Sequence, residues 1–277
     1  MNKFLVPTDF SECATNASDY AIKLAQLCNA EVIFLHIMAI PINWIQLDQN
    51  QKKLYPDITK KVHKAQSQLT EWTEKAEKQG VIAHNYLHYN ESYQNIVKSA
   101  QDNNCDLITM GYQGADSFSD LFVGSNTQRV IHISQIPVLV INKPISKIEK
   151  VALISNFEKE SYAIRDIIAR FIKLTESKLS LVYINTPLSF LDSGAIYKRI
   201  DKFKSHLACE ANESVHNDYT FETGINNFSK RNDIDLVITA THYKTGIDRF
   251  ISGSLTENII PYLYVPVLII PLLDNKN

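Results

Sequence analysis

Two glycines and a short hydroxyl-rich segment form the part of the sequence best suited to hold a ligand. Gly111 and Gly114 follow an apolar run, and nine residues later comes the segment GSNT at 124–127. Glycine lets a backbone approach a ligand closely and accepts positive φ angles. If the segment opens a helix, the free N–H groups of its first turn and the helix dipole favour a phosphate. The hydroxyls of Ser125 and Thr127 add donors without charge, so the spacing favours an anion site over turns alone.

The sequence offers no group that would catalyse a reaction on such a ligand. It lacks the patterns of a nucleophile elbow, a zinc peptidase helix, a P-loop and a dinucleotide fingerprint. His84 and His88 would share a face of a predicted strand, but no carboxylate or cysteine beside them completes a metal site. We therefore expect no catalytic residue and no metal site, and we interpret both histidines as structural.

Charge and cysteine usage restrict the class of protein. The formal net charge is -2, from 28 basic and 30 acidic residues, whereas a protein that neutralises nucleic-acid phosphates carries a basic excess. No apolar run approaches the ~20 residues of a membrane helix, and the first residues do not form a secretory signal. The four cysteines show no CxxC pair and fit free thiols in a reducing compartment. We expect a cytoplasmic protein that binds neither nucleic acid nor membrane.

The elements that must position these residues occur twice, because the chain repeats itself. Matching segments appear in the same order in both halves, which makes chance similarity a poor explanation. The matching pairs are 3–10 with 150–157, 32–37 with 180–184 and its flanks, 105–109 with 234–238, and 135–141 with 264–270. Nothing periodic crosses the segment 143–146. We therefore expect two domains, residues 1–144 and 145–277, that arose by duplication.

Each copy alternates strands with helices. In the first copy, unbroken apolar runs predict strands that are covered on both faces, and amphipathic stretches between them predict helices. The expected strands are 4–6, 31–38, 81–88, 106–110 and 138–141, and the expected helices are 11–29, 52–79, 94–103 and 127–134. This alternation predicts an open parallel sheet with helices on both faces, which binds ligands at the carboxyl ends of its strands. The second copy is shorter, mainly where the first has its long helix.

The glycine spacing and the strand ends together resemble the universal stress protein family in its tandem two-domain form. Gly111-x2-Gly114-x9-Gly124-Ser125 resembles the nucleotide-binding signature of the ATP-binding members. The first strand end, residues 6–9, and the second, residues 35–37, are also similar to that family. The resemblance implies domains of the adenine nucleotide alpha hydrolase-like fold, and ATP or another adenine nucleotide as ligand, with or without Mg²⁺. The nucleotide contacts that it implies are Pro7, Thr8, Asp9, Ile37, Met110, Gly111, Gly114, Gly124, Ser125, Asn126 and Thr127.

The second copy departs from this pattern. Ala240 stands where the first copy has Gly111, and Tyr243 stands where it has Gly114. A tyrosine would obstruct the close approach of phosphates, and Asn156, in place of Asp9, removes a carboxylate that the resemblance assigns to the nucleoside. Gly246 leaves a shifted loop open as an alternative. We expect the second copy to be degenerate.

Three functions remain open from the sequence. The leading hypothesis is a stress-response or signalling module in which bound ATP biases conformation or contacts with a protein partner. The alternatives are a scaffold for dimerisation and protein interaction, whose glycine loop is structural, and a weak ATPase. Single-copy relatives dimerise through their last strand, so the resemblance implies that the apolar strands at 137–141 and 266–270 hold the two copies together as an internal pseudo-dimer. A further homodimer of whole chains is compatible with the sequence.

Overall fold

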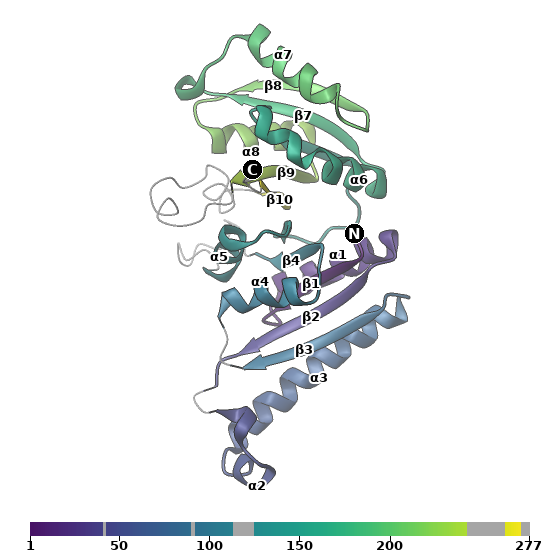
Figure 1. Ribbon diagram of the computed structural model, residues 1–277, viewed down its shortest axis with the longest axis vertical. Helices are drawn as coiled ribbons and strands as arrows, with labels where there is room; N and C mark the ends of the chain where they lie inside the picture. The colour runs from purple at the N-terminus through teal and green to yellow at the C-terminus, as the bar shows by residue number, and fades with distance from the viewer. Residues whose placement is uncertain (41–42, 90–91, 113–124, 243–263, 273–277) are drawn as a thin grey trace. The chain divides into compact units, whose positions relative to one another are not determined.

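The computed structural model describes residues 1–40, 43–89, 92–112, 125–242 and 264–272. Contacts divide the chain into two compact units, Met1–Gly111 and Tyr112–Asn277, both shown in Figure 1. The last helix and the last strand of the first repeat, α5 (Ser125–Ile133) and β5 (Val138–Ile141), therefore count with the second unit.

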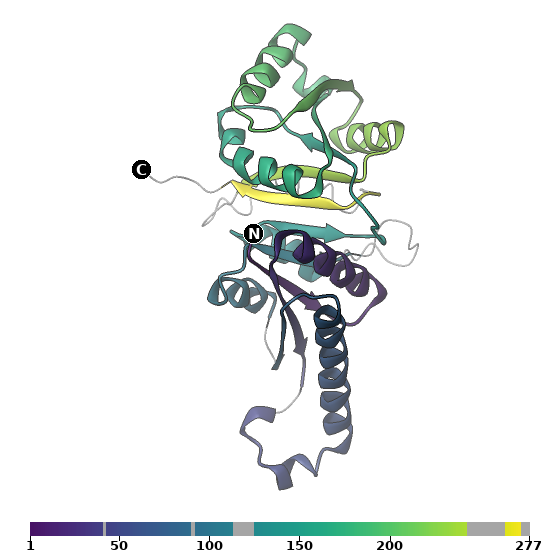
Figure 2. The same cartoon turned by 90° about the vertical axis from the view of Figure 1, so that its right-hand side faces the viewer.

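The first unit is built on parallel strands in the order β3-β2-β1-β4. Figure 2 shows its helices α1 and α3 on one side of this sheet and α4 on the other. The strands are β1 (Lys3–Thr8), β2 (Glu31–Met38), β3 (Ala83–Tyr89) and β4 (Leu107–Gly111). The helices are α1 (Glu12–Cys28), the 3₁₀ turn η1 (Trp44–Gln46), α2 (Gln49–Lys52), α3 (Pro56–Lys78) and α4 (Tyr93–Asp102).

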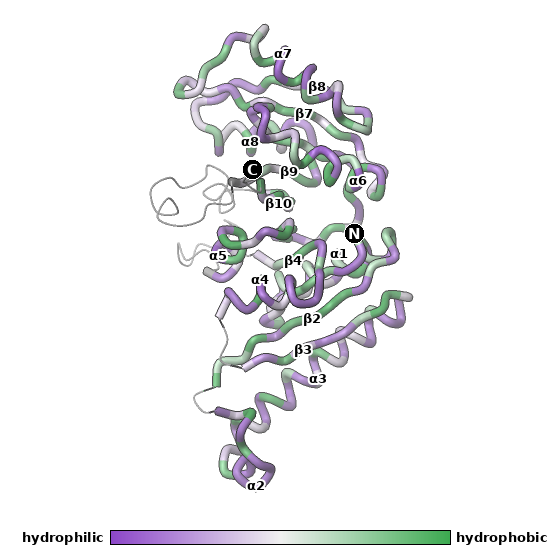
Figure 3. The backbone as a smooth tube through the Cα atoms, in the orientation of Figure 1, coloured by the Kyte–Doolittle hydropathy of each residue, from purple (hydrophilic) through white to green (hydrophobic). Residues whose placement is uncertain are grey.

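Local signals decide where the helices of this unit begin and end. The Ser11 hydroxyl caps α1 by accepting a hydrogen bond from the Ala14 N–H group, and Asn29 ends the helix in the left-handed conformation. The long helix begins at Pro56, not at residue 52 as expected, because proline suits the first helical position, where no N–H partner is needed. Figure 3 shows the resulting contrast between apolar β2 and the largely polar α3.

The second unit repeats this architecture, with strands in the order β5-β10-β9-β6-β7-β8. All neighbouring strands from β10 to β8 are parallel. They are β6 (Lys150–Ile154), β7 (Lys178–Asn185), β8 (Ala211–Asn217), β9 (Leu236–His242) and β10 (Val267–Leu272). The helices are the 3₁₀ segment η2 (Lys159–Ile164), α6 (Arg165–Thr175), η3 (Pro187–Ser189), α7 (Ser193–Lys204) and α8 (Phe221–Asn232). Helix α7 has 12 residues where α3 has 23, which confirms the expected shortening of the second copy.

The terminal strands of the two repeats pair with each other inside the second unit. Strand β5 runs antiparallel to β10, with Leu139 opposite Leu268, and both side chains are fully buried. An apolar edge strand is an aggregation hazard unless another strand covers it. Strands β5 and β10 cover each other's edge in this way, which confirms the expected pairing.

In the described ranges, every helix is too short or too polar to span a lipid bilayer. All four cysteines are free thiols. Burial raises the pKa of Cys105 to about 11, so this thiol behaves as a small core side chain.

Candidate functional site

The turn that follows β1 is held by two side chains from the implied contact set. The Thr8 hydroxyl accepts a hydrogen bond from the Phe10 N–H group at 2.9 Å, and Asp9 Oδ1 accepts one from Ser11 N–H at 2.9 Å. These bonds stabilise Phe10 at a φ of 64°, a conformation that costs energy for a bulky residue. Thr8 is buried and Asp9 is exposed, so Asp9 is the side chain of this turn that a ligand can reach.

The second repeat builds the same turn with an amide in place of the carboxylate. Ser155 Oγ accepts from Phe157 N–H at 3.0 Å, and Asn156 Oδ1 accepts from the N–H of Glu158 at 3.2 Å. Phe157 again has a positive φ, of 52°. An amide oxygen therefore suffices for the turn, and the negative charge of Asp9 is not needed for folding here.

Gly111 ends β4 directly beneath the first turn of α1. A Cβ atom at this position would lie 2.4 Å from the Cys13 carbonyl carbon and oxygen and 2.5 Å from the Ala14 nitrogen. Its φ is not positive, since Gly80 is the glycine with positive φ among the described residues. Glycine at 111 thus allows the first turn of α1 to approach the end of the strand.

The end of β2 is tied to the end of β1 by a histidine. His36 Nδ1 lies 2.6 Å from the Thr8 carbonyl oxygen, and the two strands are in register at these residues. The Phe10 ring stacks at a tilt on the His36 ring, with 4.6 Å between centroids, and meets Trp72 edge-on at 5.7 Å. This aromatic group orients the strand ends next to Ile37, which is half-buried. The LHI pattern was part of the resemblance, but the packing of Phe10 was not expected from the sequence.

The implied contacts fall into three groups. The first unit brings six of them to the carboxyl ends of its strands β1, β2 and β4: Pro7, Thr8, Asp9, Ile37, Met110 and Gly111. Of these, Pro7, Thr8 and Met110 are buried, so a ligand would meet their backbone rather than their side chains. The second unit contains the other described contacts, which open α5: Ser125, Asn126 and Thr127. Gly114 and Gly124 lie outside the described residues.

Helix α5 begins at Ser125, two residues earlier than the expected start. Thr127 is buried, whereas Asn126 is exposed. Residues 125–127 thus open a helix, and a helix start is the kind of element that can hold an anion.

Cys13 is a half-buried thiol in the first turn of α1, next to Gly111, and the sequence did not single it out. Burial, with the charges of Glu12 and Asp9, raises its pKa above the ordinary value. Such a thiol stays protonated at neutral pH and is a poor nucleophile.

In the second repeat, an ion pair lies beside the equivalent turn. Arg199 Nη1 is 2.9 Å from Glu158 Oε1 and 3.5 Å from the Asn156 carbonyl oxygen. The Tyr162 ring packs edge-on against Phe203 at 5.7 Å in the same region. Asn156 is exposed, as Asp9 is, but in the second repeat Arg199 contacts the backbone of this strand end.

The comparison with known proteins agrees with both repeats. A model of the universal stress protein family matches residues 1–142 and 167–271. Two universal stress proteins of Methanocaldococcus jannaschii are 29% identical over 150 residues and 27% identical over 153 residues. Each alignment covers 51% of this chain, and 82% and 94% of the respective relative, so single-copy relatives correspond to one repeat.

Solved structures match the whole chain. A universal stress protein from Archaeoglobus fulgidus superimposes with a TM-score of 0.76 at 18% identity and covers 98% of this chain and 99% of its own. A protein from Pseudomonas aeruginosa does so with a TM-score of 0.70 at 14% identity, covering 98% and 93%. At these identities the likeness concerns the fold, here the tandem form.

Proposed function

Since the chain belongs to the universal stress protein family, we propose that its first repeat binds ATP or another adenine nucleotide and acts through binding rather than catalysis. The nucleoside contacts are assigned to the ends of β1 and β2, and the phosphate contacts to residues 124–127. Bound nucleotide would bias the conformation of the chain or its contacts with a protein partner.

The observation that carries this proposal is the difference between the two copies of the turn after the first strand. Asp9 and Asn156 accept the same hydrogen bond, so the carboxylate adds nothing to the turn that an amide lacks. A charge retained on an exposed side chain at the carboxyl edge of a parallel sheet lies where such sheets bind ligands. A carboxylate there can accept hydrogen bonds from the hydroxyls of a ribose.

The strand ends of the first repeat also fit a flat, partly apolar ligand. Pro7 and Met110 are buried at the ends of β1 and β4, and Ile37 is half-buried at the end of β2. Ile37 presents part of its apolar side chain, whereas a ligand would meet Pro7 and Met110 through backbone groups. A purine needs both, since it has an apolar face and a polar edge.

We expect no rapid turnover of the bound nucleotide. General acid–base help is worth about 10²–10⁴ in rate and needs a group placed at the reacting atom. Asp9 is assigned to the nucleoside end, away from the γ-phosphate, and one of its oxygens already accepts from Ser11. A turnover near ~10 s⁻¹, ordinary for an enzyme, would contradict this assignment.

The substitution Asp9→Asn tests the proposal, because it installs the residue that the second repeat tolerates. The turn and the fold should persist, while the affinity for ATP should fall about tenfold or more through loss of a charge-assisted hydrogen bond. Isothermal titration calorimetry measures the affinity, and circular dichroism with thermal unfolding checks the fold. Asn156→Asp in the second repeat is the matched control and should leave the affinity unchanged.

Mass spectrometry of the small molecules released from the purified chain is an independent check. An adenine nucleotide, found in the unmodified protein and reduced in the Asp9→Asn variant, is the expected result. Equal ATP affinity in both proteins would show that Asp9 serves the turn alone.

A further inference from the structure

An exposed apolar surface lies at the carboxyl ends of β7 and β8 in the second unit. Leu188 is 99% exposed and Phe190 is 70% exposed in the segment after β7, and Tyr219 is 87% exposed in the turn after β8. Asn185 and Asn217 are partners in the register of the two strands, so these two segments begin side by side. We call Leu188, Phe190 and Tyr219 the apolar surface of the second repeat.

Hydrogen bonds hold the segment after β7 in place. The buried Asn185 side chain accepts from the Leu191 N–H group at 3.1 Å, and it donates to the Leu191 carbonyl oxygen at 3.3 Å and to Asn217 Oδ1 at 3.1 Å. The Thr186 and Ser189 hydroxyls lie 2.8 Å apart inside the same segment. A loop that is already ordered loses little conformational entropy when a partner binds. Large exposed apolar side chains on such a loop therefore suit a protein interface.

The charged residues of these two segments are acidic. Asp192 ends the segment after β7, and Asp218 and Glu222 lie in the chain that follows β8. No lysine or arginine occurs in residues 185–192 or 217–223. A partner that matches this surface therefore needs apolar side chains together with basic ones.

The chain carries a surface of that kind in the first repeat, after the equivalent strand β2. Ile45 is 71% exposed and Leu54 is 74% exposed. Residues 48–64 contain five lysines and two aspartates. Figure 1 shows α2 and the start of α3 beyond the carboxyl ends of β2 and β3. We call Ile45, Leu54 and these lysines the basic surface of the first repeat.

A small core anchors the basic surface. The buried Trp44 packs with Ile40 and Val62, and Lys52 Nζ lies 5.3 Å from the centre of the Trp44 ring. The ion pairs that α3 makes among the described residues lie near its carboxyl end instead. The other lysines of the basic surface are exposed to an acidic partner: Lys53, Lys60, Lys61 and Lys64.

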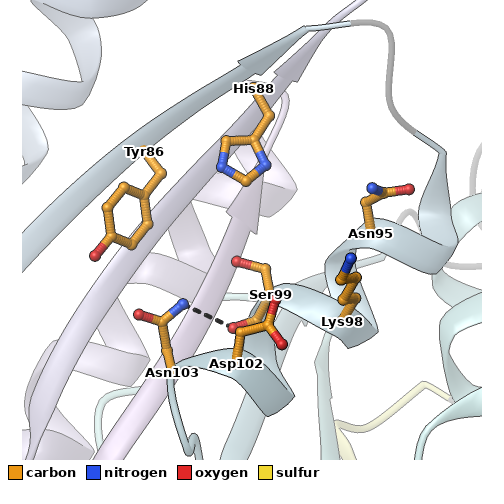
Figure 4. Close-up of a pocket in the computed structure, with 7 residues that line it drawn as sticks. All are labelled: Tyr86, His88, Asn95, Lys98, Ser99, Asp102 and Asn103. Atoms are coloured by element: carbon orange, nitrogen blue, oxygen red, sulfur yellow. Dashed lines mark hydrogen bonds between the residues drawn. The ribbon is translucent and has the colours of Figure 1, made fainter.

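The outer strand of the first repeat does not carry the apolar surface of the second. Figure 4 shows Tyr86 and His88 of β3 opposite polar side chains of α4, across a polar cavity of about 240 Å³. The chain after the equivalent strand β8 presents the exposed Tyr219. The two repeats have thus diverged into unlike surfaces of opposite charge.

We propose that a second copy of this chain covers the apolar surface, and that the basic surface of one copy docks on the apolar surface of the other. Opposite charges around apolar side chains give such a contact its attraction and its register. Phe190 and Tyr219 offer about 150–250 Å² each. With Leu188 they supply roughly half of the about 800 Å² that each partner buries in a standard interface. A two-fold pair of copies contains this contact twice, and none of the proposed nucleotide contacts takes part in it.

Sedimentation equilibrium of the full chain, without added nucleotide, tests the proposal. We expect reversible self-association that weakens as salt is added, because exposed charges are screened. One variant combines Ile45→Ser with Leu54→Ser, and another combines Leu188→Ser with Phe190→Ser. Each should weaken self-association about tenfold or more, as the loss of central apolar contacts does in other interfaces. An equimolar mixture of the two variants should associate again, because a mixed pair keeps one contact with both surfaces intact.

Leu27→Ser, which removes an exposed leucine of α1 outside both surfaces, is the matched control and should associate as the unmodified chain does. Lys53→Glu with Lys60→Glu keeps every apolar side chain and should also weaken association, which separates the role of charge from that of apolar contact. Circular dichroism checks the fold of each variant. A chain that stays monomeric at the highest concentrations reached would overturn the proposal. Full association in either serine variant or in the glutamate variant, or a mixture that stays monomeric, would overturn it as well.

Discussion

At the scale of single residues, a comparison of the two repeats distinguishes groups that fold the chain from groups that a ligand can reach. Phe10 and Phe157 both adopt a positive φ, and Thr8 and Ser155 accept equivalent hydrogen bonds from their N–H groups. What these turns share is structural. The carboxylate of Asp9 is the part that differs, and for that reason the functional proposal rests on it.

Asp218 should couple stability to acid pH. Hydrogen bonds from Asn227 and Thr223 lower the pKa of this carboxyl to about 2 from an ordinary value of 3.8. The unfolded chain then binds more protons than the folded chain between these values, so stability is present above about pH 4 and is lost as pH falls toward 2. Asp218→Asn should remove this part of the pH dependence of the free energy of unfolding. The exposed Asp201→Asn is the control, and equal slopes in both variants would contradict the prediction.

At the scale of elements, each repeat brings the start of a helix to the end of a strand. In the first repeat α1 begins directly at Glu12, above Gly111. In the second repeat the equivalent stretch starts as the 3₁₀ segment η2 and becomes α-helical at Arg165, and Ala240 stands in the strand. The second repeat, which carries the Ala240 side chain at this strand position, thus also starts its helix differently.

Gly111→Ala should therefore destabilise the first unit. The new methyl group would lie 2.4–2.5 Å from backbone atoms of Cys13 and Ala14, so α1 must shift. Forced overpacking of this kind costs about 1–3 kcal/mol, which chemical denaturation can measure. Ala240→Gly, the reciprocal change, should cost only about 0.5–1 kcal/mol from backbone entropy. A neutral Gly111→Ala would mean that α1 tolerates the added group.

At the scale of the whole molecule, the duplication predicts one nucleotide site for each chain. The second repeat lacks the carboxylate of Asp9, and Arg199 lies against its strand end. Calorimetry should give one ATP per chain, and Gly114→Val should abolish binding while it leaves the fold intact. Two equivalent sites, or full affinity after that substitution, would refute this view of the repeats.

The pairing of the terminal strands can be tested by hydrogen exchange. Leu268 lies opposite Leu139, so Leu268→Glu places a charge at a fully buried position of the antiparallel pair. Amide exchange should then accelerate in β5 as well as in β10, because each strand supplies hydrogen-bonding partners to the other. If exchange changes in β10 alone, β5 does not depend on this pairing in solution.

The sequence alone determined the internal repeat, the order of strands and helices along the chain, and most of their boundaries. These follow from local rules: apolar runs mark β2 and β5, Ser11 caps α1, and Asn29 ends it. The glycine spacing and the family resemblance also predicted a set of nucleotide contacts. The expected start of the long helix at residue 52 was wrong, because residues 49–52 form a separate short helix and Pro56 occupies the first position of the long one.

Only the tertiary structure decided what those residues touch. It showed that Gly111 admits a helix and that Asp9 and Asn156 accept equivalent hydrogen bonds in their turns. These facts depend on contacts between residues far apart in the chain. The sequence pattern records the type and spacing of neighbours along the chain, whereas close approach, burial and empty volume arise only when separate elements pack together.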